Sequence, residues 1–250
     1  MRNRARFVPS LFTILNLFCG FLSIINAANN NPDQACLFII YAALFDAFDG
    51  VVARFTGTSS KFGVELDSLA DIISFGAAPS YLMYRLYFYQ FNGLGIALAS
   101  LIMIFSALRL ARFNTQLTGF DKNFFIGLPV PISAVTVASF FLYYFNKDFS
   151  MDLSSTFAYL LCIILPLLMV SRFKYDTTPK FTPKEFKTHP VKTILVILIL
   201  VMILATKGEG LFAFCLFYLS IGIFRGFKNL FKKIFLSNKA TEETSRVKLT

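Results

Sequence analysis

Four aspartates are placed where they can act together, within a short stretch of an otherwise apolar sequence. Asp46 and Asp49 are three residues apart, and Asp67 and Asp71 are four residues apart. On an α-helix, residues at these spacings lie on one face, so each pair presents both carboxylates in the same direction. The segment 55–62, FTGTSSKF, is polar and is typical of a short connection between two helices. Two adjacent antiparallel helices would therefore bring all four carboxylates towards one point.

Converging carboxylates next to an apolar phase need positive charge to stay ionised, because a low dielectric disfavours the charged form. Two kinds of compensation are open. Protons would neutralise one or two of the groups, as in a proton-coupled or cation-coupled transporter. Divalent cations would compensate all four and keep them as ligands, and oxygen donors without histidine or cysteine suit Mg²⁺ or Mn²⁺. Because Mg²⁺ readily shares its coordination shell with phosphate oxygens, this second alternative also indicates a phosphorylated substrate.

The elements that must position these carboxylates are membrane helices. Of the 250 residues, 56% are hydrophobic and 15% are charged, whereas a soluble domain carries about 25% charged residues. The apolar residues fall in long blocks, and a block of roughly 18 residues can cross the ~30 Å hydrocarbon layer as a helix. The sequence therefore predicts an all-α, polytopic membrane helix bundle of about eight transmembrane helices, at 9–28, 34–54, 63–84, 93–111, 129–145, 153–170, 191–205 and 211–224.

The basic residues predict the orientation of the bundle. With an even number of crossings, both termini share one side with the connections near 55–62, 112–126 and 171–190. All 24 lysines and arginines are assigned to that side except Arg85, Lys147 and Lys207. Because basic residues concentrate on the cytoplasmic side, both termini and the carboxylates should face the cytoplasm, at a plasma membrane of the bacterial inner-membrane type. The net charge of +10 then reflects topology and contact with anionic membrane lipids, and no nucleic-acid partner is expected.

Other catalytic chemistries lack the residues that they need. His189 is the only histidine and lies in a connection, which excludes a Ser-His-Asp triad and a multi-histidine zinc site. The four cysteines are scattered singly through apolar blocks and are interpreted as buried thiols. No linker divides the chain, which predicts a single membrane catalytic domain over 1–224. Residues 225–250 form a cytoplasmic tail that begins with a basic amphipathic segment, RGFKNLFKKIF, and is expected to be disordered beyond it.

Small and basic residues beside the aspartates favour a phosphate ligand. Gly50 follows Asp49 directly, and Ala53 and Arg54 complete the same turn. Gly63 opens the next predicted helix. Glycine and alanine allow a backbone or a bulky ligand to approach closely. Arg54, at the cytoplasmic end, can hold a phosphate by paired hydrogen bonds. These neighbours therefore support the alternative with a phosphorylated substrate.

The whole stretch, DAFDGVVARFTGTSSKFGVELDSLAD, resembles the signature of the CDP-alcohol phosphotransferase family, DxxDGxxARx8GxxxDxxxD, at every fixed position. The resemblance implies two divalent cations, Mg²⁺ or Mn²⁺, that bind the diphosphate of CDP-diacylglycerol, from which an alcohol displaces CMP. It implies that the metal ligands are Asp46, Asp49, Asp67 and Asp71, and that Asp71 is also the general base. The residues implied for the CDP-lipid site are Gly50, Ala53, Arg54, Ser60, Gly63, Thr13 and Asn16. The resemblance also implies a homodimer.

Further stretches resemble the phosphatidylserine synthase branch of that family, and they imply L-serine as the acceptor alcohol. They are PSLFTILNLFCGFLS at 9–23, DSLADIISFGAAPS at 67–80, ALRLARFN at 107–114 and FIGLPVPISA at 125–134, so the resemblance covers mainly 9–135. Arginine suits the carboxylate of serine, and the candidates for serine binding are Arg109, Arg112 and Asn114. Two alternatives stay open at this stage: an acceptor such as glycerol phosphate or inositol, and arginines that serve only as anchors on the cytoplasmic side.

Overall fold

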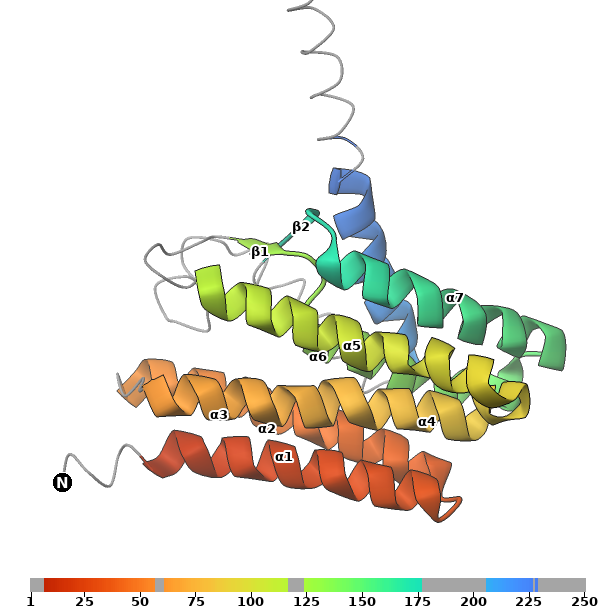
Figure 1. Cartoon of the computed structure of the whole chain (residues 1–250), viewed down its shortest axis with the longest axis horizontal. Helices are drawn as coiled ribbons and strands as arrows, with labels where there is room; N and C mark the ends of the chain where they lie inside the picture. The colour runs from red at the N-terminus through yellow and green to blue at the C-terminus, as the bar shows by residue number, and fades with distance from the viewer. Residues whose placement is uncertain (1–6, 57–60, 117–123, 177–205, 227, 229–250) are drawn as a thin grey trace, which may run out of the picture.

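A computed structural model describes residues 7–56, 61–116, 124–176, 206–226 and 228, in which long helices run side by side (Figure 1). The first two helices, α1 (Phe7–Ala28) and α2 (Pro32–Thr56), form an antiparallel pair. Asn30 makes the tight turn between them with a φ of 60°, a left-handed conformation that asparagine tolerates better than most residues. The turn places the second half of α2, which carries Asp46 and Asp49, beside the first half of α1.

The third crossing is one run of helix that changes its geometry directly after Asp71. It consists of α3 (Lys61–Asp71), a π-helical segment η2 (Ile72–Ala77) and α4 (Ala78–Leu86). The sequence predicted a helix at 63–84 but not the π-helical segment inside it. Pro79 supplies a physical reason, because proline lacks an N–H and its ring clashes with the carbonyl four residues earlier in a regular α-helix. Such π segments occur frequently at functional sites.

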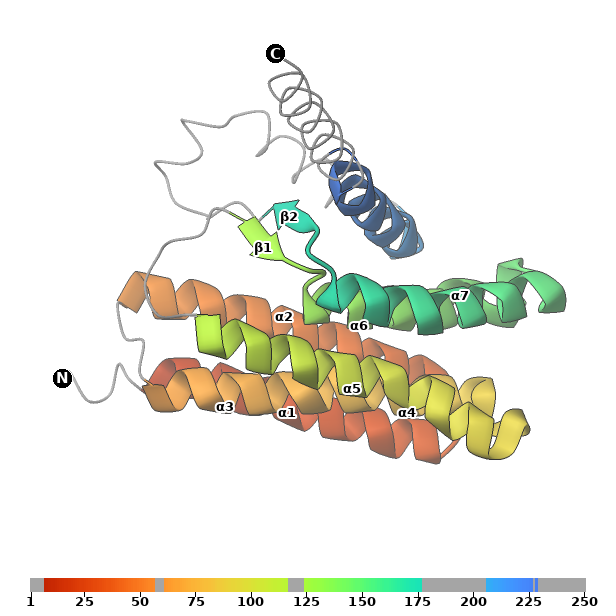
Figure 2. The same ribbon diagram turned by 45° about the horizontal axis from the view of Figure 1, so that its top comes forward.

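The remaining helices pack against the first three. A 3₁₀ turn, η3 (Phe88–Phe91), precedes α5 (Asn92–Gln116). The next crossing is α6 (Val130–Ser139), which continues as a π-helical segment, η4 (Phe140–Asp148), and is followed by α7 (Met151–Val170). A last helix, Gly210–Gly226, is drawn in blue in Figures 1 and 2. In this helix, the ring centroid of Phe212 lies 5.5 Å from the ring centroid of Phe140.

The helices confirm an integral membrane protein of the predicted helical class. Four of them are long and apolar enough to cross a membrane by length and composition: Leu11–Ala28, Pro32–Val52, Phe88–Thr115 and Met151–Val170. Val130–Phe145 and Gly210–Gly226 are shorter apolar helices. The total of eight crossings stays a prediction, because the predicted helix at 191–205 lies outside the described residues.

Helix α1 has the two faces that a lipid-facing helix requires. Its outer face exposes large apolar side chains: Leu11, Ile14, Phe18, Phe21 and Ile25. Its inner face, at the complementary helical spacing, carries small or polar buried residues: Thr13, Asn16, Gly20, Ser23 and Ala27. This distribution is the reverse of that in a soluble bundle. It fits a helix whose neighbours approach closely while lipid covers the large side chains.

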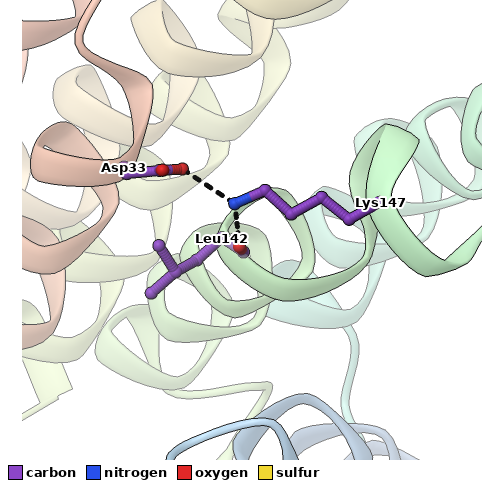
Figure 3. A network of polar contacts seen from close by, with 3 residues as sticks. All are labelled: Asp33, Leu142 and Lys147. Carbon is purple, nitrogen blue, oxygen red and sulfur yellow. Dashed lines mark hydrogen bonds and ion pairs between the residues drawn. The ribbon is translucent and has the colours of Figure 1, made fainter.

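The end of the bundle at the α1–α2 turn contains two of the three basic residues that the sequence assigned to the side opposite the termini. Arg85 donates a hydrogen bond to Oδ1 of Asn30 at 2.9 Å. Lys147 forms an ion pair of 3.0 Å with Asp33 and donates to the carbonyl oxygen of Leu142 at 2.6 Å (Figure 3). These contacts attach α4 and η4 to the turn. Which end faces the cytoplasm stays a prediction.

A short β ladder lies at the other end of the bundle. The prediction of an all-α protein did not include these strands. Strands β1 (Phe124–Ile126) and β2 (Lys174–Asp176) pair antiparallel, with Phe125 opposite Tyr175. The ring of Tyr175 stacks on Tyr218 of the helix Gly210–Gly226 at 5.5 Å. Burial raises the pKa of the Tyr175 phenol, so this ring is neutral at physiological pH. The ladder therefore joins the last helix to the connections that follow α5 and α7.

Candidate active site

Three of the four signature aspartates form one compact group of carboxylates. Asp46 on α2 and Asp67 and Asp71 on α3 each place an oxygen atom within 4.8 Å of the others. Asp49 lies one turn from Asp46 on the same helix and is buried, with 8% of its surface exposed, while Asp71 is 7% exposed. The structure thus brings together side chains from two antiparallel helices whose connection, at 57–60, lies outside the described residues.

Helix α1 contributes two hydrogen bonds to these carboxylates. The hydroxyl of Thr13 donates to Oδ2 of Asp49, and the side-chain amide of Asn16 donates to Oδ1 of Asp71 at 3.3 Å. The sequence had assigned Thr13 and Asn16 to the CDP-lipid site, and the structure places both against the aspartates. A signal for this contact exists in the sequence, since polar residues three positions apart in an apolar helix mark a face turned away from lipid.

Close packing fixes the height of α1 against the π-helical segment. The hydroxyl of Ser74 donates to the backbone carbonyl of Asn16 at 2.9 Å. A Cβ atom at Gly20 would lie 2.6 Å from the Cα atom of Ser74, which is closer than side chains tolerate. Gly20 therefore permits a contact that places Asn16 beside Asp71, and η2 positions Ser74 only three residues after that aspartate.

The three residues predicted to bind serine lie in different surroundings at the end of α5. Arg109 is 8% exposed, lies within electrostatic range of Asp71, and its Nε atom has no hydrogen-bond partner among the described residues. Arg112 donates from Nη1 to the carbonyl oxygen of Val170 at 3.2 Å, at the end of α7. Asn114 donates to the hydroxyl of Ser68, beside Asp67, at 2.9 Å. Of the two arginines, Arg109 is the one that is buried within electrostatic range of Asp71.

The predicted CDP-lipid residues are only partly described. Gly50 is half-buried on α2 and Gly63 is half-buried in the first turn of α3. Ala53 and Arg54 lie in the backbone of the last turns of α2, but their side chains are outside the described part. Ser60 is also outside it. The assignment of these residues to a nucleotide lipid therefore stays a prediction.

The donor set fits a hard divalent cation. Asp46, Asp67 and Asp71 offer three carboxylate oxygens within 4.8 Å of one another, close enough for a common ion. Oxygen ligands of this kind are those that Mg²⁺ and Mn²⁺ prefer. Asp49 stands outside this group of three but next to Asp46 on the same face of α2, where it can complete a second, adjacent set of carboxylates. The arrangement is able to hold cations and, with them, a phosphate ester.

Comparison with known proteins agrees with this geometry. Residues 6–163 match the CDP-alcohol phosphatidyltransferase family. A CDP-diacylglycerol–serine O-phosphatidyltransferase of Helicobacter pylori (strain ATCC 700392 / 26695) is 39% identical over 236 residues, which are 93% of this chain and 96% of that protein. An archaetidylserine synthase of Methanothermobacter thermautotrophicus is 41% identical over 170 residues, 67% of this chain and 69% of that protein. A CDP-diacylglycerol–serine O-phosphatidyltransferase of Bacillus subtilis is 35% identical over 192 residues, 75% of this chain and 96% of that protein.

The similarity to the Helicobacter protein covers 93% of the chain, and so extends well beyond the stretch at 9–135 in which the sequence motifs lie. The matched family range, 6–163, contains all four aspartates and both hydrogen-bond donors of α1. The chain belongs to the CDP-alcohol phosphatidyltransferase family.

Proposed function

We propose that this protein transfers the phosphatidyl group of CDP-diacylglycerol to the hydroxyl of L-serine and releases CMP. The observation that carries the proposal is the group of carboxylates from Asp46, Asp67 and Asp71, whose oxygens lie within 4.8 Å of one another, inside a complete family signature. The choice of serine is supported by the relatives, among them enzymes named for the synthesis of phosphatidylserine and archaetidylserine.

The four aspartates are proposed to hold two divalent cations, Mg²⁺ or Mn²⁺. Two ions in such a site neutralise the diphosphate and stabilise both the attacking and the leaving oxygen of an in-line displacement. Asp67 is the central ligand in this proposal, because its carboxylate is near those of Asp46 and Asp71 and also within electrostatic range of Asp49. Gly50, Ala53, Arg54, Ser60 and Gly63 are proposed to line the adjoining CDP-lipid site.

Asp71 is proposed as the general base of a direct displacement. The serine hydroxyl oxygen forms a bond to the phosphorus that carries diacylglycerol, and the bond from that phosphorus to the oxygen of CMP breaks. The hydroxyl proton passes to the Asp71 carboxylate, and CMP leaves with the electron pair of the broken bond. Asp71 suits this role because it is buried, which limits the access of bulk water, and because no histidine joins the described group of carboxylates.

Arg109 is proposed to bind the carboxylate of serine. Its guanidinium is buried near Asp71 and keeps an Nε donor without a protein partner among the described residues. A planar guanidinium binds a carboxylate through two parallel hydrogen bonds, which distinguishes serine from acceptors that carry only hydroxyls. Arg112 and Asn114 each use one donor on a neighbouring element, and they are proposed to contribute to the serine site through their other donors.

The orientation in the membrane, the domain organisation and the oligomeric state are proposed as the sequence predicted them. The carboxylates face the cytoplasm at a bacterial-type inner membrane, within one membrane catalytic domain over 1–224. The basic amphipathic segment at the start of the tail is proposed to contact anionic lipids, and two chains are proposed to form a homodimer.

A radiolabel assay tests the proposed reaction. Membranes that contain the protein receive CDP-diacylglycerol, Mn²⁺ or Mg²⁺, and labelled serine, and phosphatidylserine and CMP are measured. Parallel reactions contain glycerol 3-phosphate or inositol, and membranes with the Asp71→Asn variant report the background. Equal amounts of phosphatidylserine and CMP are expected with serine alone. Product with another alcohol but none with serine would refute the acceptor and leave the family chemistry intact.

A further inference from the structure

Two side chains of α1 reach two different helices of the carboxylate site. Thr13 donates to Asp49 on α2, 36 residues further along the chain. Asn16 donates to Asp71 at the end of α3, 55 residues further along. The two donors are three residues apart and therefore share one face of α1. Among the described residues outside α2 and α3, only this face of α1 donates hydrogen bonds to the signature aspartates.

Both donors are withdrawn from solvent and committed to their carboxylates. Thr13 is 2% exposed and Asn16 is fully buried. A hydroxyl has a single hydrogen to donate, and that of Thr13 is given to Asp49. The orientation of the Asn16 amide follows from chemistry, because an ionised carboxylate only accepts hydrogen bonds and so requires the nitrogen. The amide oxygen then has no partner among the described residues.

Contacts with Ser74 of η2 also determine the position of α1 along the bundle. Ser74 binds the backbone carbonyl of Asn16 itself, and Gly20, one turn further, allows the backbones to meet. A shift of α1 by one residue would break this contact and turn both donors away from the aspartates. The packing of α1 against η2 thus supports the position from which both side chains donate.

We infer that Thr13 and Asn16 are positioning residues that orient the carboxylates of Asp49 and Asp71, and that they do not bind the CDP-lipid. The inference deepens the proposed function and rests on it for the roles of the two aspartates. Hydrogen bonds to metal-ligating carboxylates fix their orientation, and removing such partners typically costs about 10–100-fold in metal affinity or activity. Thr13 acts on a proposed ion ligand, whereas Asn16 acts on a proposed ion ligand that is also the proposed base, so the loss of Asn16 should lower kcat by misorienting the base.

Two sets of variants separate these consequences. Thr13→Val removes the hydroxyl with little change in shape, and Thr13→Ser restores it. Asn16→Leu and the smaller Asn16→Ser both remove the amide donor, so that the result does not depend on one replacement. Ser23→Ala is the matched control, because Ser23 lies on the same buried face of α1 and its hydroxyl has no hydrogen-bond partner among the described residues.

Each purified variant is measured in nanodiscs in two ways. Mn²⁺ affinity is determined without substrates by electron paramagnetic resonance, and kcat and KM are determined for CDP-diacylglycerol and for the acceptor alcohol. Size-exclusion chromatography and thermal unfolding establish that each variant is folded. We expect Thr13→Val to weaken Mn²⁺ binding about 10-fold or more, and Thr13→Ser to restore it to within about twofold.

For both Asn16 variants we expect kcat to fall about 10–100-fold while the KM for CDP-diacylglycerol changes by less than about threefold, because the base is misoriented and the lipid contacts stay intact. Ser23→Ala should leave every parameter unchanged. A rise of about 10-fold or more in the KM for CDP-diacylglycerol, with unchanged Mn²⁺ affinity and kcat, would overturn the inference in favour of direct lipid contact.

A failure of the proposed function is recognised separately. If the unaltered protein uses an alcohol other than serine, the Mn²⁺ titration still tests Thr13, and turnover with that alcohol still tests Asn16. Loss of serine activity in the unaltered protein therefore refutes the acceptor, while the pattern across the variants decides the role of α1.

Discussion

Replacing Asp71 by asparagine should abolish turnover and, at the same time, make the ion-free protein more stable. The amide has the shape of the carboxyl group but cannot take the proton of the attacking hydroxyl. General bases contribute about 10²–10⁴-fold to rates, so kcat should fall at least about 100-fold. The Oδ1 atom that accepts from Asn16 is present in both side chains, so this contact can persist in the variant.

The gain in stability follows from the spacing of the carboxylates. Asp71 shares a group with Asp46 and Asp67 in which the oxygens lie within 4.8 Å. At this separation two unit charges repel by about 3.5 kcal/mol if the effective dielectric constant is about 20. A shorter separation within the group would increase this repulsion, and partial protonation in the absence of cations relieves part of it. A net gain of about 1–3 kcal/mol corresponds to a rise of roughly 2–10 °C in the unfolding temperature.

Thermal unfolding in nanodiscs, with EDTA and with Mn²⁺, measures both effects alongside the turnover assay. The unaltered protein should be stabilised by Mn²⁺ through mass action, and the variant should gain less because it has lost a ligand. Asp152→Asn is the control, since Asp152 is an exposed acid in the first turn of α7. Residual turnover above about one tenth of the original, or a lower unfolding temperature of the ion-free variant, would refute the reasoning.

Three further substitutions test the packing, the acceptor site and the far end of the bundle. Gly20→Ala forces α1 away from η2, so it should lower the stability by about 1–3 kcal/mol and also reduce turnover. Gly93 has open space around it, so Gly93→Ala should leave the unfolding temperature unchanged. Arg109→Lys keeps the charge but loses the planar fork, and steady-state kinetics should show the KM for serine rising about 10-fold with that for CDP-diacylglycerol unchanged. Lys147→Met removes the exposed ion pair with Asp33, and should lower stability by less than about 1 kcal/mol with full activity.

Local periodicity explains why the carboxylates could be located without coordinates. Asp46 and Asp49, like Asp67 and Asp71, are separated by intervals that a helix converts into one face, and a short polar connection leaves two helices no arrangement other than side by side. Long apolar blocks likewise identify membrane helices, because the thickness of the hydrocarbon layer sets their length. The grouping of Asp46 with Asp67 and Asp71 could therefore be predicted from spacing alone.

The contacts between distant segments followed from tertiary structure. The sequence contains Thr13 and Asn16, but whether they face a lipid substrate or the aspartates depends on how α1 crosses the second and third helices. The crossing is set by the fit of Gly20 against Ser74 and by the π-helical segment that begins after Asp71. Neither feature leaves a periodic signal, because each arises from the packing of two backbones.

The residues predicted to bind the acceptor also show the difference between what the sequence predicted and what the tertiary structure added. Arg109 and Arg112 are neighbours in the sequence and had equal claims to bind serine, yet Arg109 is buried near Asp71 while Arg112 binds the end of α7. The sequence by itself determined the long apolar helices and the cluster of aspartates, since these depend on spacing within one or two adjacent helices, and its resemblance to a family signature indicated the class of reaction. Only the tertiary structure decided which side chains donate hydrogen bonds to the aspartates and which arginine is within electrostatic range of Asp71, because such contacts depend on the register between helices that are far apart in the chain.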